Sequence, residues 1–289
     1  KVVQFVAKNL SFTKASQELF VSQPAITKHI QELEATYQTR LFDRQGSKIS
    51  LTESGRLLLE HCERILEDYK RLEYEMHLLH NEYIGELKLG ASTTIAQYVL
   101  PPLLGSFIGK FPQVNLSLLN GNSREIEAAL QEHRIDLGLV EGVFRLPNLK
   151  YTTFLEDELV AVVHSKSRLQ LPEEITPQDL PAIPLVLRER GSGTLDVIER
   201  SLQKHGVKLS SLHVLMYLGS TESIKLFLEN SDCMGIVSIR SICKELAAGT
   251  FRVVEIKDMP MLRDFCFVQL QGQEGGLSQA FMNYMFMSR

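Results

Sequence analysis

A polar stretch near the start of the chain has the residue types and spacing needed to hydrogen-bond to the edges of nucleic-acid bases. From residue 23 onward, polar side chains recur at positions that share one face of a helix. Amides and hydroxyls both donate and accept, as base edges in the major groove require, and a single cation suits phosphate or guanine. A solvated helix face has a similar composition, so this stretch alone does not establish the function. The candidate base-reading residues are Gln23, Pro24, Thr27, Lys28 and Gln31.

The elements around this stretch predict a helix-turn-helix. Residues 1–9 have the pattern of the end of a helix, and Thr13 can cap a second short helix. A tight turn at 21–22 leads to a third helix that begins near Gln23. Pro24 lies in the first turn of that helix, where a missing N–H costs nothing. Two short helices joined by a tight turn are typical of this DNA-binding motif.

A small basic wing is predicted directly after the third helix. Residues 41–42 begin a strand, 43–48 form a polar turn, and 49–51 return as a second strand. The first fifty residues carry seven Lys and Arg against four Asp and Glu, although the whole chain has a net charge of -4. A helix-turn-helix with a basic wing is more specific for DNA than either part, since cations on the wing meet phosphates. The candidate wing residues are Arg40, Arg44 and Lys48.

Short motifs in this order and spacing resemble the LysR-type transcriptional regulator family. They are SFTKAS at 11–16, VSQPAI at 21–26, LE at 33–34, LFDR at 41–44 and LTESG at 51–55. Leu10 and Ser16 stand where glycine and alanine are more usual in the family. The resemblance implies that residues matching Gln23, Pro24, Thr27 and Lys28 face the bases, and that wing residues touch the DNA backbone or minor groove.

A long amphipathic helix is predicted next, capped by Thr52 or Ser54 and running to about Asn81. Its apolar residues alternate in steps of four and three, which is a heptad seam, and charged residues fill the other faces. Packing against its own domain is the alternative, but its length and polarity favour an intermolecular coiled coil. A dimer presents two recognition helices to two half-sites of a pseudo-palindromic operator in double-stranded DNA. The resemblance implies dimers and often tetramers. The seam residues are Leu58, Cys62, Ile65, Tyr69, Leu72, Met76 and Leu79.

Beyond a hinge at Gly85, strands alternate with helices in two sets, which predicts parallel sheets covered by helices. The first set includes a helix over 93–111 that breaks near Pro101 and Pro102. Apolar strands at 158–164 and 265–270 are expected to cross between two lobes.

The predicted fold class is therefore multidomain, α+β and α/β. A winged helix-turn-helix (1–55) and a linker helix (56–84) precede a two-lobed α/β effector-binding domain (85–289). Lobe I is expected over about 85–160 and 268–289, and lobe II over about 161–267. The resemblance implies the same architecture, similar to periplasmic solute-binding proteins.

Small hydroxylated residues and glycines follow several predicted strands and predict a ligand site. In open α/β sheets, ligands bind beyond the carboxyl ends of strands, where free helix N–H groups attract anions. Such residues often only cap helices, but several ends that meet at one cleft favour a small anionic effector, such as a carboxylate. Arg188 or Arg190 can add charge. The candidate effector residues are Ser92, Thr93, Thr94, Gly121, Asn122, Ser192, Gly193, Thr194, Ser220 and Thr221.

Other functional classes fit the chain less well. No apolar run approaches the length of a membrane span, and early charges interrupt any signal peptide, which argues against a secreted solute-binding protein. No nucleophile, phosphate-loop or metal-ligand motif is present, so an enzyme, a cofactor and a metal are not expected. Thiol sensing is the rival to ligand sensing, but Cys233 and Cys243 are predicted to be core residues. Four scattered cysteines fit the reducing cytoplasm.

Overall fold

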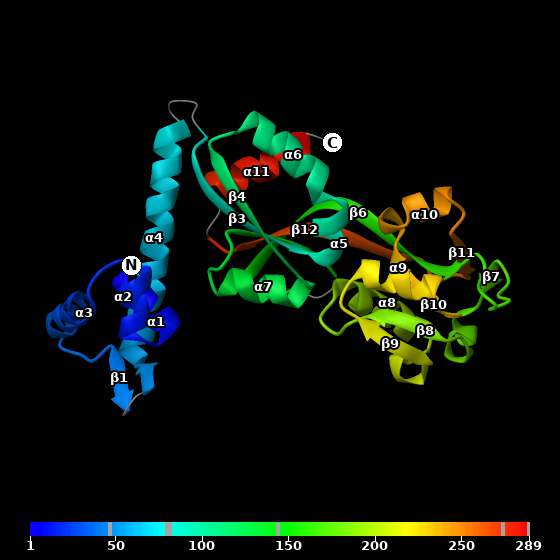
Figure 1. Cartoon of the computed structure of the whole chain (residues 1–289), viewed down its shortest axis with the longest axis horizontal. Coiled ribbons are helices and arrows are strands. Elements are labelled where there is room, and N and C mark those ends of the chain that lie inside the picture. Colours follow the sequence, from blue (N-terminus) through cyan, green and yellow to red (C-terminus); the bar gives the residue numbers. More distant parts are fainter. Residues whose placement is uncertain (46–47, 79–82, 143–144, 273–274, 288–289) are drawn as a thin grey trace. The chain divides into compact units, whose positions relative to one another are not determined.

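The structure, a computed structural model, describes residues 1–45, 48–78, 83–142, 145–272 and 275–287 (Figure 1). The chain divides into two compact units, Lys1–Asn81 and Glu82–Arg289. Along the described part of the chain, no helix is both long and apolar enough to cross a membrane.

The first unit is a three-helix cluster followed by a hairpin and a long helix. Its core is made of apolar residues from all of these elements, and the rings of Phe12 and Phe42 meet edge to face at 5.9 Å. The two hairpin strands pair antiparallel, with Phe42 opposite Leu51. The predicted winged helix-turn-helix is therefore present. Its elements are α1 (Val2–Asn9), α2 (Phe12–Glu18), α3 (Gln23–Tyr37), β1 (Phe42–Gln45), β2 (Lys48–Leu51) and α4 (Glu53–Leu78).

Side-chain caps set where these helices begin. The cap of α2 is Ser11, whose hydroxyl accepts from the N–H of Lys14, so the prediction of Thr13 was wrong by two residues. Ser22 caps α3 ahead of Pro24. Thr52 accepts from the N–H of Gly55 at 2.9 Å, which makes Thr52 the cap of α4. Each cap satisfies an N–H group that the first helical turn leaves without a partner.

Gly55 allows the first turn of α4 to pack closely against the backbone of Leu41, the residue before the wing. A Cβ atom at this position would lie 2.0 Å from the carbonyl oxygen of Leu41. That oxygen belongs to the backbone and accepts from the N–H of Thr52, so it has little room to move. The glycine of the LTESG motif is thus a packing requirement of the fold.

The second unit contains two lobes built on parallel strands. In lobe I, β3 lies between β4 and β5 and is parallel to both, and in lobe II, β8 lies between β9 and β10 in the same way. A short parallel pair, β7 with β11, completes lobe II. The strands of lobe I are β3 (Gly85–Ser92), β4 (Val114–Gly121) and β5 (Leu137–Glu141). Those of lobe II are β7 (Glu174–Ile175), β8 (Leu185–Arg188), β9 (Val214–Leu218), β10 (Met234–Ser238) and β11 (Phe251–Ile256).

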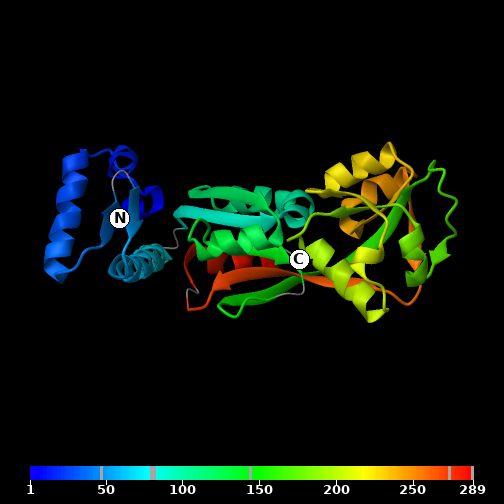
Figure 2. The same cartoon turned by 90° about the horizontal axis from the view of Figure 1, so that it is seen from below.

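Two long antiparallel strands connect the lobes, as predicted, and they are longer than predicted. β6 (Leu149–His164) and β12 (Met261–Leu270) pair along ten residues of each, with a register shift at Phe265–Cys266. β12 also pairs with β5 of lobe I, whereas β6 also pairs with β10 of lobe II. Figure 2 shows both strands running from one lobe into the other. The predicted lobe boundaries at 160/161 and 267/268 lie inside these two strands.

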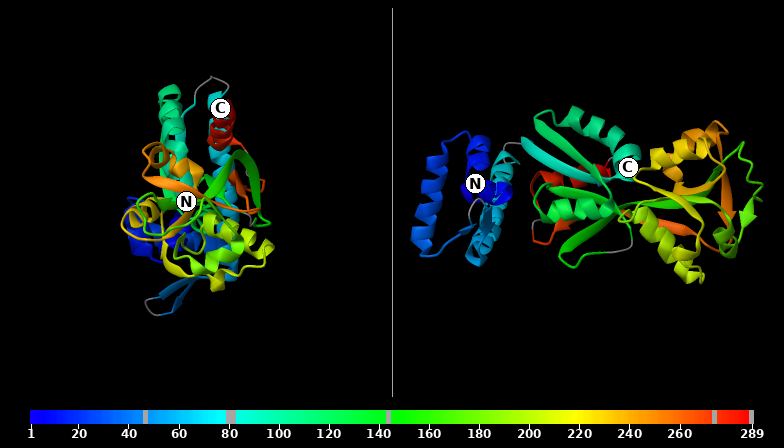
Figure 3. Two further views of the ribbon diagram at one scale, coloured as in Figure 1. Left: turned by 90° about the vertical axis from the view of Figure 1, so that its right-hand side faces the viewer. Right: turned by 60° about the horizontal axis from the view of Figure 1, so that its bottom comes forward.

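One ten-stranded sheet runs through both lobes, and helices cover its two faces, as Figures 1 and 3 show for α6 and α11 on one face of lobe I and α7 on the other. The helix predicted over 93–111 does break, but at Val99, and Pro101 and Pro102 lie in the first turn of its second half. Lobe I contains α5 (Thr93–Tyr98), α6 (Leu100–Lys110), α7 (Ser123–Gln131) and α11 (Gly276–Met287). Lobe II contains α8 (Gly193–Lys204), α9 (Thr221–Glu229) and α10 (Cys243–Ala247), together with short 3-10 turns at Pro177–Ala182, Leu209–Ser211 and Ile239–Ser241.

Each lobe has its own apolar core. Leu89, Phe107 and Phe267 are fully buried in lobe I, and Leu185, Ile198 and Ile236 are fully buried in lobe II. Because parallel strands point the same way, β3, β4 and β5 all end at one edge of lobe I, and β8, β9 and β10 all end at one edge of lobe II. Loops at these edges carry the candidate effector residues.

Candidate functional site

The predicted base-reading face of α3 is exposed. Gln23, Pro24, Lys28 and Gln31 are exposed and Thr27 is half-buried, whereas Ile26 and Ile30 on the other side are fully buried in the core. The side chain of Gln23 donates to the Thr27 hydroxyl at 3.3 Å, which aligns an amide and a hydroxyl on the surface. The Lys28 Nζ atom is 3.9 Å from the Glu32 carboxylate, and both side chains are exposed. Such a weak ion pair leaves Lys28 able to bind a phosphate instead. The helix therefore presents hydrogen-bonding groups to solvent, while its buried face is fixed in the core of the first unit.

The wing is tied to the end of α3 by Glu34. Its carboxylate accepts from the N–H groups of Leu41 and Phe42, at 2.8 and 3.4 Å. These two hydrogen bonds give the glutamate of the LE motif a structural role, because they hold the start of the wing against α3. Arg40 is exposed beside the wing. Arg44 and Lys48 lie on β1 and β2, where the structure describes only their backbone.

The predicted seam on α4 is exposed over its second half. Ile65, Tyr69, Leu72 and Met76 are 66%, 56%, 55% and 53% exposed. Leu58 packs half-buried against the core of the first unit, Cys62 is half-buried, and Leu79 lies outside the described residues. Ile65, Leu72 and Met76 therefore form an exposed apolar row at heptad spacing on this helix.

A polar pocket of about 290 Å³ lies where the strand ends of the two lobes meet. Lobe I contributes residues from α5, from the end of β4 and from the start of α7. Lobe II contributes residues from the ends of β8 and β9. Four of the predicted effector residues, Thr93, Gly121, Asn122 and Ser220, lie in its wall. The lining residues are Thr93, Gln97, Asn120, Gly121, Asn122, Glu125, Glu189, Gly219 and Ser220.

None of the other predicted effector residues is among the described residues that line this pocket. Ser92 donates to the carboxylate of Glu141, and Thr194 accepts from Arg263 at 2.9 Å. Ser192 caps α8, and Thr94 and Thr221 are buried. Gly193 lies against the end of β5, since a Cβ atom there would be 1.9 Å from the carbonyl oxygen of Glu141. Their part in effector binding stays a prediction.

A buried charged cluster joins the crossing strands to both lobes. The Arg263 guanidinium on β12 contacts Asp157 on β6 at 2.8 Å and Glu141 at the end of β5 at 3.5 Å. Ser238, at the end of β10, donates to Asp157 at 2.7 Å. These carboxylates and the guanidinium are almost completely removed from solvent. Because an unpaired buried charge is costly, the cluster couples the positions of strands from both lobes.

Arg188 is buried directly behind the wall of the pocket. Its Nη2 atom contacts the Thr93 hydroxyl at 3.4 Å and the Gly219 carbonyl at 3.3 Å, and both residues line the pocket. The guanidinium also donates twice to Glu189, at 2.8 and 3.0 Å. Within the described residues, its Nη1 atom has no hydrogen-bond partner although it is buried. The second arginine considered from the sequence, Arg190, is exposed.

A second polar contact bridges the lobes between α5 and α9. The Tyr98 hydroxyl on α5 donates to Glu222 on α9, and Glu222 also accepts from the buried Lys225 at 2.8 Å. Burial and the bond to Glu222 raise the pKa of Tyr98. Burial acts to raise the pKa of Glu222, but hydrogen bonds from Lys225 and Tyr98 outweigh it, so that pKa is lowered. The bridge therefore keeps its charges and its proton across the physiological range.

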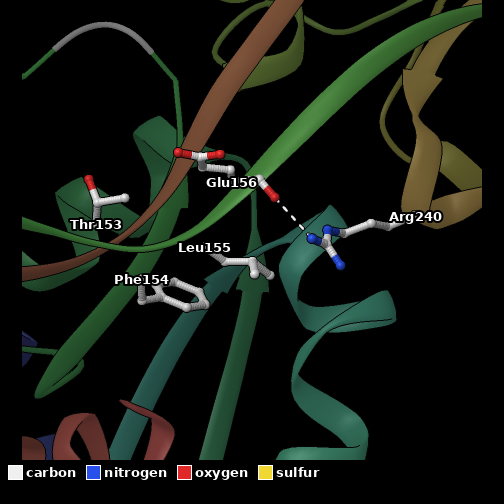
Figure 4. Close-up of a pocket in the computed structure, with 5 residues that line it drawn as sticks. All are labelled: Thr153, Phe154, Leu155, Glu156 and Arg240. Carbon is white, nitrogen blue, oxygen red and sulfur yellow. Dashed lines mark hydrogen bonds between the residues drawn. The ribbon is translucent and has the colours of Figure 1, made fainter. Parts of the chain in front are cut away.

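A further pocket of about 350 Å³ lies beside the crossing strand β6. Its wall contains Thr153, Phe154, Leu155, Glu156 and Arg240 (Figure 4). The Arg240 guanidinium donates to the carbonyl oxygen of Glu156 at 3.0 Å. This pocket has fewer polar side chains in its wall than the pocket between the strand ends. It is therefore the weaker candidate for an effector site.

The cysteines do not form a reactive pair. Cys233 is buried, and burial raises the pKa of its thiol to about 11. Burial also raises the pKa of the Cys266 thiol. Cys243 is exposed at the start of α10, so its prediction as a core residue was wrong. A thiol that keeps its proton is a poor nucleophile.

Comparison with known proteins identifies the family. Residues 1–56 match the family of bacterial regulatory helix-turn-helix proteins, lysR family, and residues 80–286 match the LysR substrate binding domain. The chain belongs to the LysR family of transcriptional regulators. It is therefore a DNA-binding regulator with an effector-binding domain, and membership in this family confirms that it is not an enzyme.

Relatives of this LysR regulator align along most of its length. It is 29% identical over 263 residues to the HTH-type transcriptional regulator CysL of Bacillus subtilis, which covers 91% of this chain and 87% of that protein. The regulatory domain of CcmR from Synechocystis, solved in complex with 2-PG, matches with a TM-score of 0.64 and 28% identity, covering 71% of this chain and 97% of that domain. Full-length CbnR, solved with its target DNA, has the same fold, with a TM-score of 0.62 at 22% identity, covering 100% and 98% of the two chains.

Five pocket residues of this LysR regulator were not predicted from its sequence: Gln97, Asn120, Glu125, Glu189 and Gly219. Asn120, Glu189 and Gly219 are direct neighbours of residues that were considered. Gln97 is on the second turn of α5, and Glu125 is on the first turn of α7. Extending each candidate strand end by one helical turn would have found them.

Proposed function

We propose that this LysR regulator binds a pseudo-palindromic operator as a dimer or tetramer and responds to a small, anionic effector held between its lobes. The pocket at the strand ends is the observation that carries the proposal. Its wall includes Thr93 and Asn122 from lobe I and Glu189 and Ser220 from lobe II. A ligand that contacts both lobes binds one arrangement of them better than another, and that difference is what shifts a population.

The proposed dimer is supported by the exposed apolar row on α4. Ile65, Leu72 and Met76 each expose more than half of their surface at heptad spacing. A second copy of the helix covers such a row, and the pairing brings two α3 helices to one DNA site. A DNA-binding regulator works where its operator DNA is, so we place it in the cytoplasm.

The anionic effector is supported by Arg188. Its Nη1 atom is buried and has no partner among the described residues, and the same guanidinium contacts two residues of the pocket wall. An effector carboxylate satisfies that donor. The CcmR regulatory domain, which is 28% identical, was solved with a small ligand, 2-PG, so a similar role for this domain is consistent with that relative.

DNA binding is tested by fluorescence anisotropy with the DNA upstream of the protein's own gene, over a series of salt concentrations. We expect sequence-selective binding that weakens with salt. Lys28→Ala should reduce the slope of log K against log salt by about 1, and Gln31→Ala should reduce selectivity. Lys204→Ala, which removes an exposed lysine from the second unit, is the matched control. Binding that is equal on unrelated DNA, or insensitive to salt, would contradict the proposal.

Self-association is tested by analytical ultracentrifugation. Leu72→Glu places a charge on the seam and should shift the protein toward monomer, because like charges would meet in the paired helices. Asp68→Ala, an exposed change on the same helix, should not. An oligomer that is unaffected by Leu72→Glu would show that the helix is not the interface.

A further inference from the structure

The pocket between the strand ends is lined by hydrogen-bonding groups. Its wall consists of hydroxyls, side-chain amides, two carboxylates and two glycines, and no aliphatic or aromatic residue is among the described residues that line it. Sites for drug-like ligands are mostly apolar with a few polar groups. A wall of this kind therefore favours a small hydrophilic molecule over an aromatic one.

Buried polar atoms around the pocket indicate which groups that molecule must carry. Among the described residues, Gln97 Oε1 is a buried acceptor without a donor, and Arg188 Nη1 is a buried donor without an acceptor. Thr94 Oγ1, next to the pocket residue Thr93, is likewise buried and unpaired. Buried polar groups nearly always have a partner in native proteins. A ligand with an acceptor for the guanidinium and a donor for the amide oxygen satisfies both.

The carboxylates of the wall limit how much negative charge the ligand can have. Glu189 accepts two hydrogen bonds from the Arg188 guanidinium, at 2.8 and 3.0 Å. The negative charge of Glu189 therefore already balances the positive charge of Arg188. Glu125 accepts from the N–H of Asn122 at 2.9 Å, which leaves its other oxygen available. A second negative charge on the ligand would lie close to these carboxylates, and like charges repel at such distances.

We propose that the pocket selects a small monocarboxylate that carries a hydrogen-bond donor on the adjacent carbon, the chemistry shared by α-hydroxy and α-amino acids. This rests on the proposed function, in which the same pocket is the effector site. The carboxylate binds Arg188, and the donor binds Gln97 and the free oxygen of Glu125. A dicarboxylate and a monocarboxylate without a donor are both disfavoured.

Four probes of matched size test the selection: L-lactate, L-alanine, propionate and malonate. Lactate and alanine add a hydroxyl or an ammonium to the propionate skeleton, and malonate has a second carboxylate in place of its methyl group. Binding to the full chain is measured by isothermal titration calorimetry. At least one of lactate and alanine should bind about tenfold tighter than propionate, since a site built to pair a donor rejects the analogue that lacks it. Which of the two binds better decides between a hydroxy and an amino acid.

A substitution at the wall gives an independent readout. Glu189→Gln removes one negative charge and frees Arg188, so the preference for lactate or alanine over malonate should fall at least about tenfold. Arg190→Gln changes an exposed neighbour and should leave the preference unchanged. Circular dichroism of both variants establishes that they are folded.

Propionate or malonate binding as tightly as lactate and alanine would overturn the selection, and so would the absence of binding by all four probes. If malonate or propionate binds and alters the affinity for operator DNA, the pocket is still an effector site and only the assigned ligand class fails. If no probe binds while the protein still binds its operator, the ligand class fails and the DNA-binding part of the proposed function stands.

Discussion

Replacing Arg263 by methionine tests whether the buried charged cluster holds the second unit together. The change keeps most of the volume of the side chain but removes contacts with Asp157 at 2.8 Å, Glu141 at 3.5 Å and Thr194 at 2.9 Å. The side chains of Asp157 and Glu141 are 0% and 2% exposed, so the variant leaves both carboxylates buried without this cation, and Asp157 keeps only its longer contact with Arg240.

The expected loss of stability follows from that burial. Removing one partner of a buried ion pair costs about 3–5 kcal/mol, because the remaining charge stays out of water. For a domain of this size, each kcal/mol lowers the midpoint of thermal unfolding by roughly 2–4 °C, so the expected fall is about 6–20 °C. Differential scanning calorimetry of the full chain measures it, and the transition of the first unit should not change.

Arg240→Met is the matched control. Arg240 contacts the same carboxylate, Asp157, at 3.6 Å, but its side chain is 41% exposed. Ion pairs near the surface contribute about 0–1 kcal/mol, so this variant should unfold within a few degrees of the parent. The reasoning is refuted if Arg263→Met is no less stable than Arg240→Met, since burial would then not decide the cost.

Three further predictions concern other parts of the chain. Gly55→Ala should destabilise the first unit and weaken operator binding, because its Cβ would lie 2.0 Å from the carbonyl oxygen of Leu41; unchanged unfolding by circular dichroism would argue against this packing requirement. Burial raises the pKa of Glu127, so the folded state holds its proton more tightly than the unfolded state, and that stability is lost as pH rises through the folded pKa. Glu127→Gln should therefore raise the unfolding temperature at neutral pH, and a pH series should show the gain shrinking as pH falls through the raised pKa and absent below about pH 4. In thiol labelling of the folded protein, Cys243 should react well before Cys233, whose pKa is about 11; equal rates would contradict the assigned burial.

Local patterns in the sequence were sufficient to predict the helix-turn-helix, the wing and the crossing strands. These depend on interactions between residues close in the chain: Pro24 in a first turn, alternating apolar residues, and a heptad spacing on the linker helix. The capping residue of α2 was misplaced because Ser11 and Thr13 have similar capping chemistry, and only the path of the backbone decides between them.

The ligand site was predicted less completely, because its residues come from four chain segments whose spacing no local pattern reports. Strand ends were recognised by their small hydroxylated residues, but such residues serve equally as caps and as links between lobes. The structure places Ser92 against Glu141 and Thr194 against Arg263, and places Gln97 and Glu189 in the pocket wall instead.

The sequence by itself determined the class of protein, because the helix-turn-helix and wing are encoded by short-range spacing. Only the tertiary structure decided which polar groups are left for a ligand. Buried polar atoms must find partners, and the folded chain satisfies most of them internally. Among the described residues, two of those that remain, Gln97 Oε1 and Arg188 Nη1, lie on or next to the pocket wall and become visible only once the two lobes are packed together.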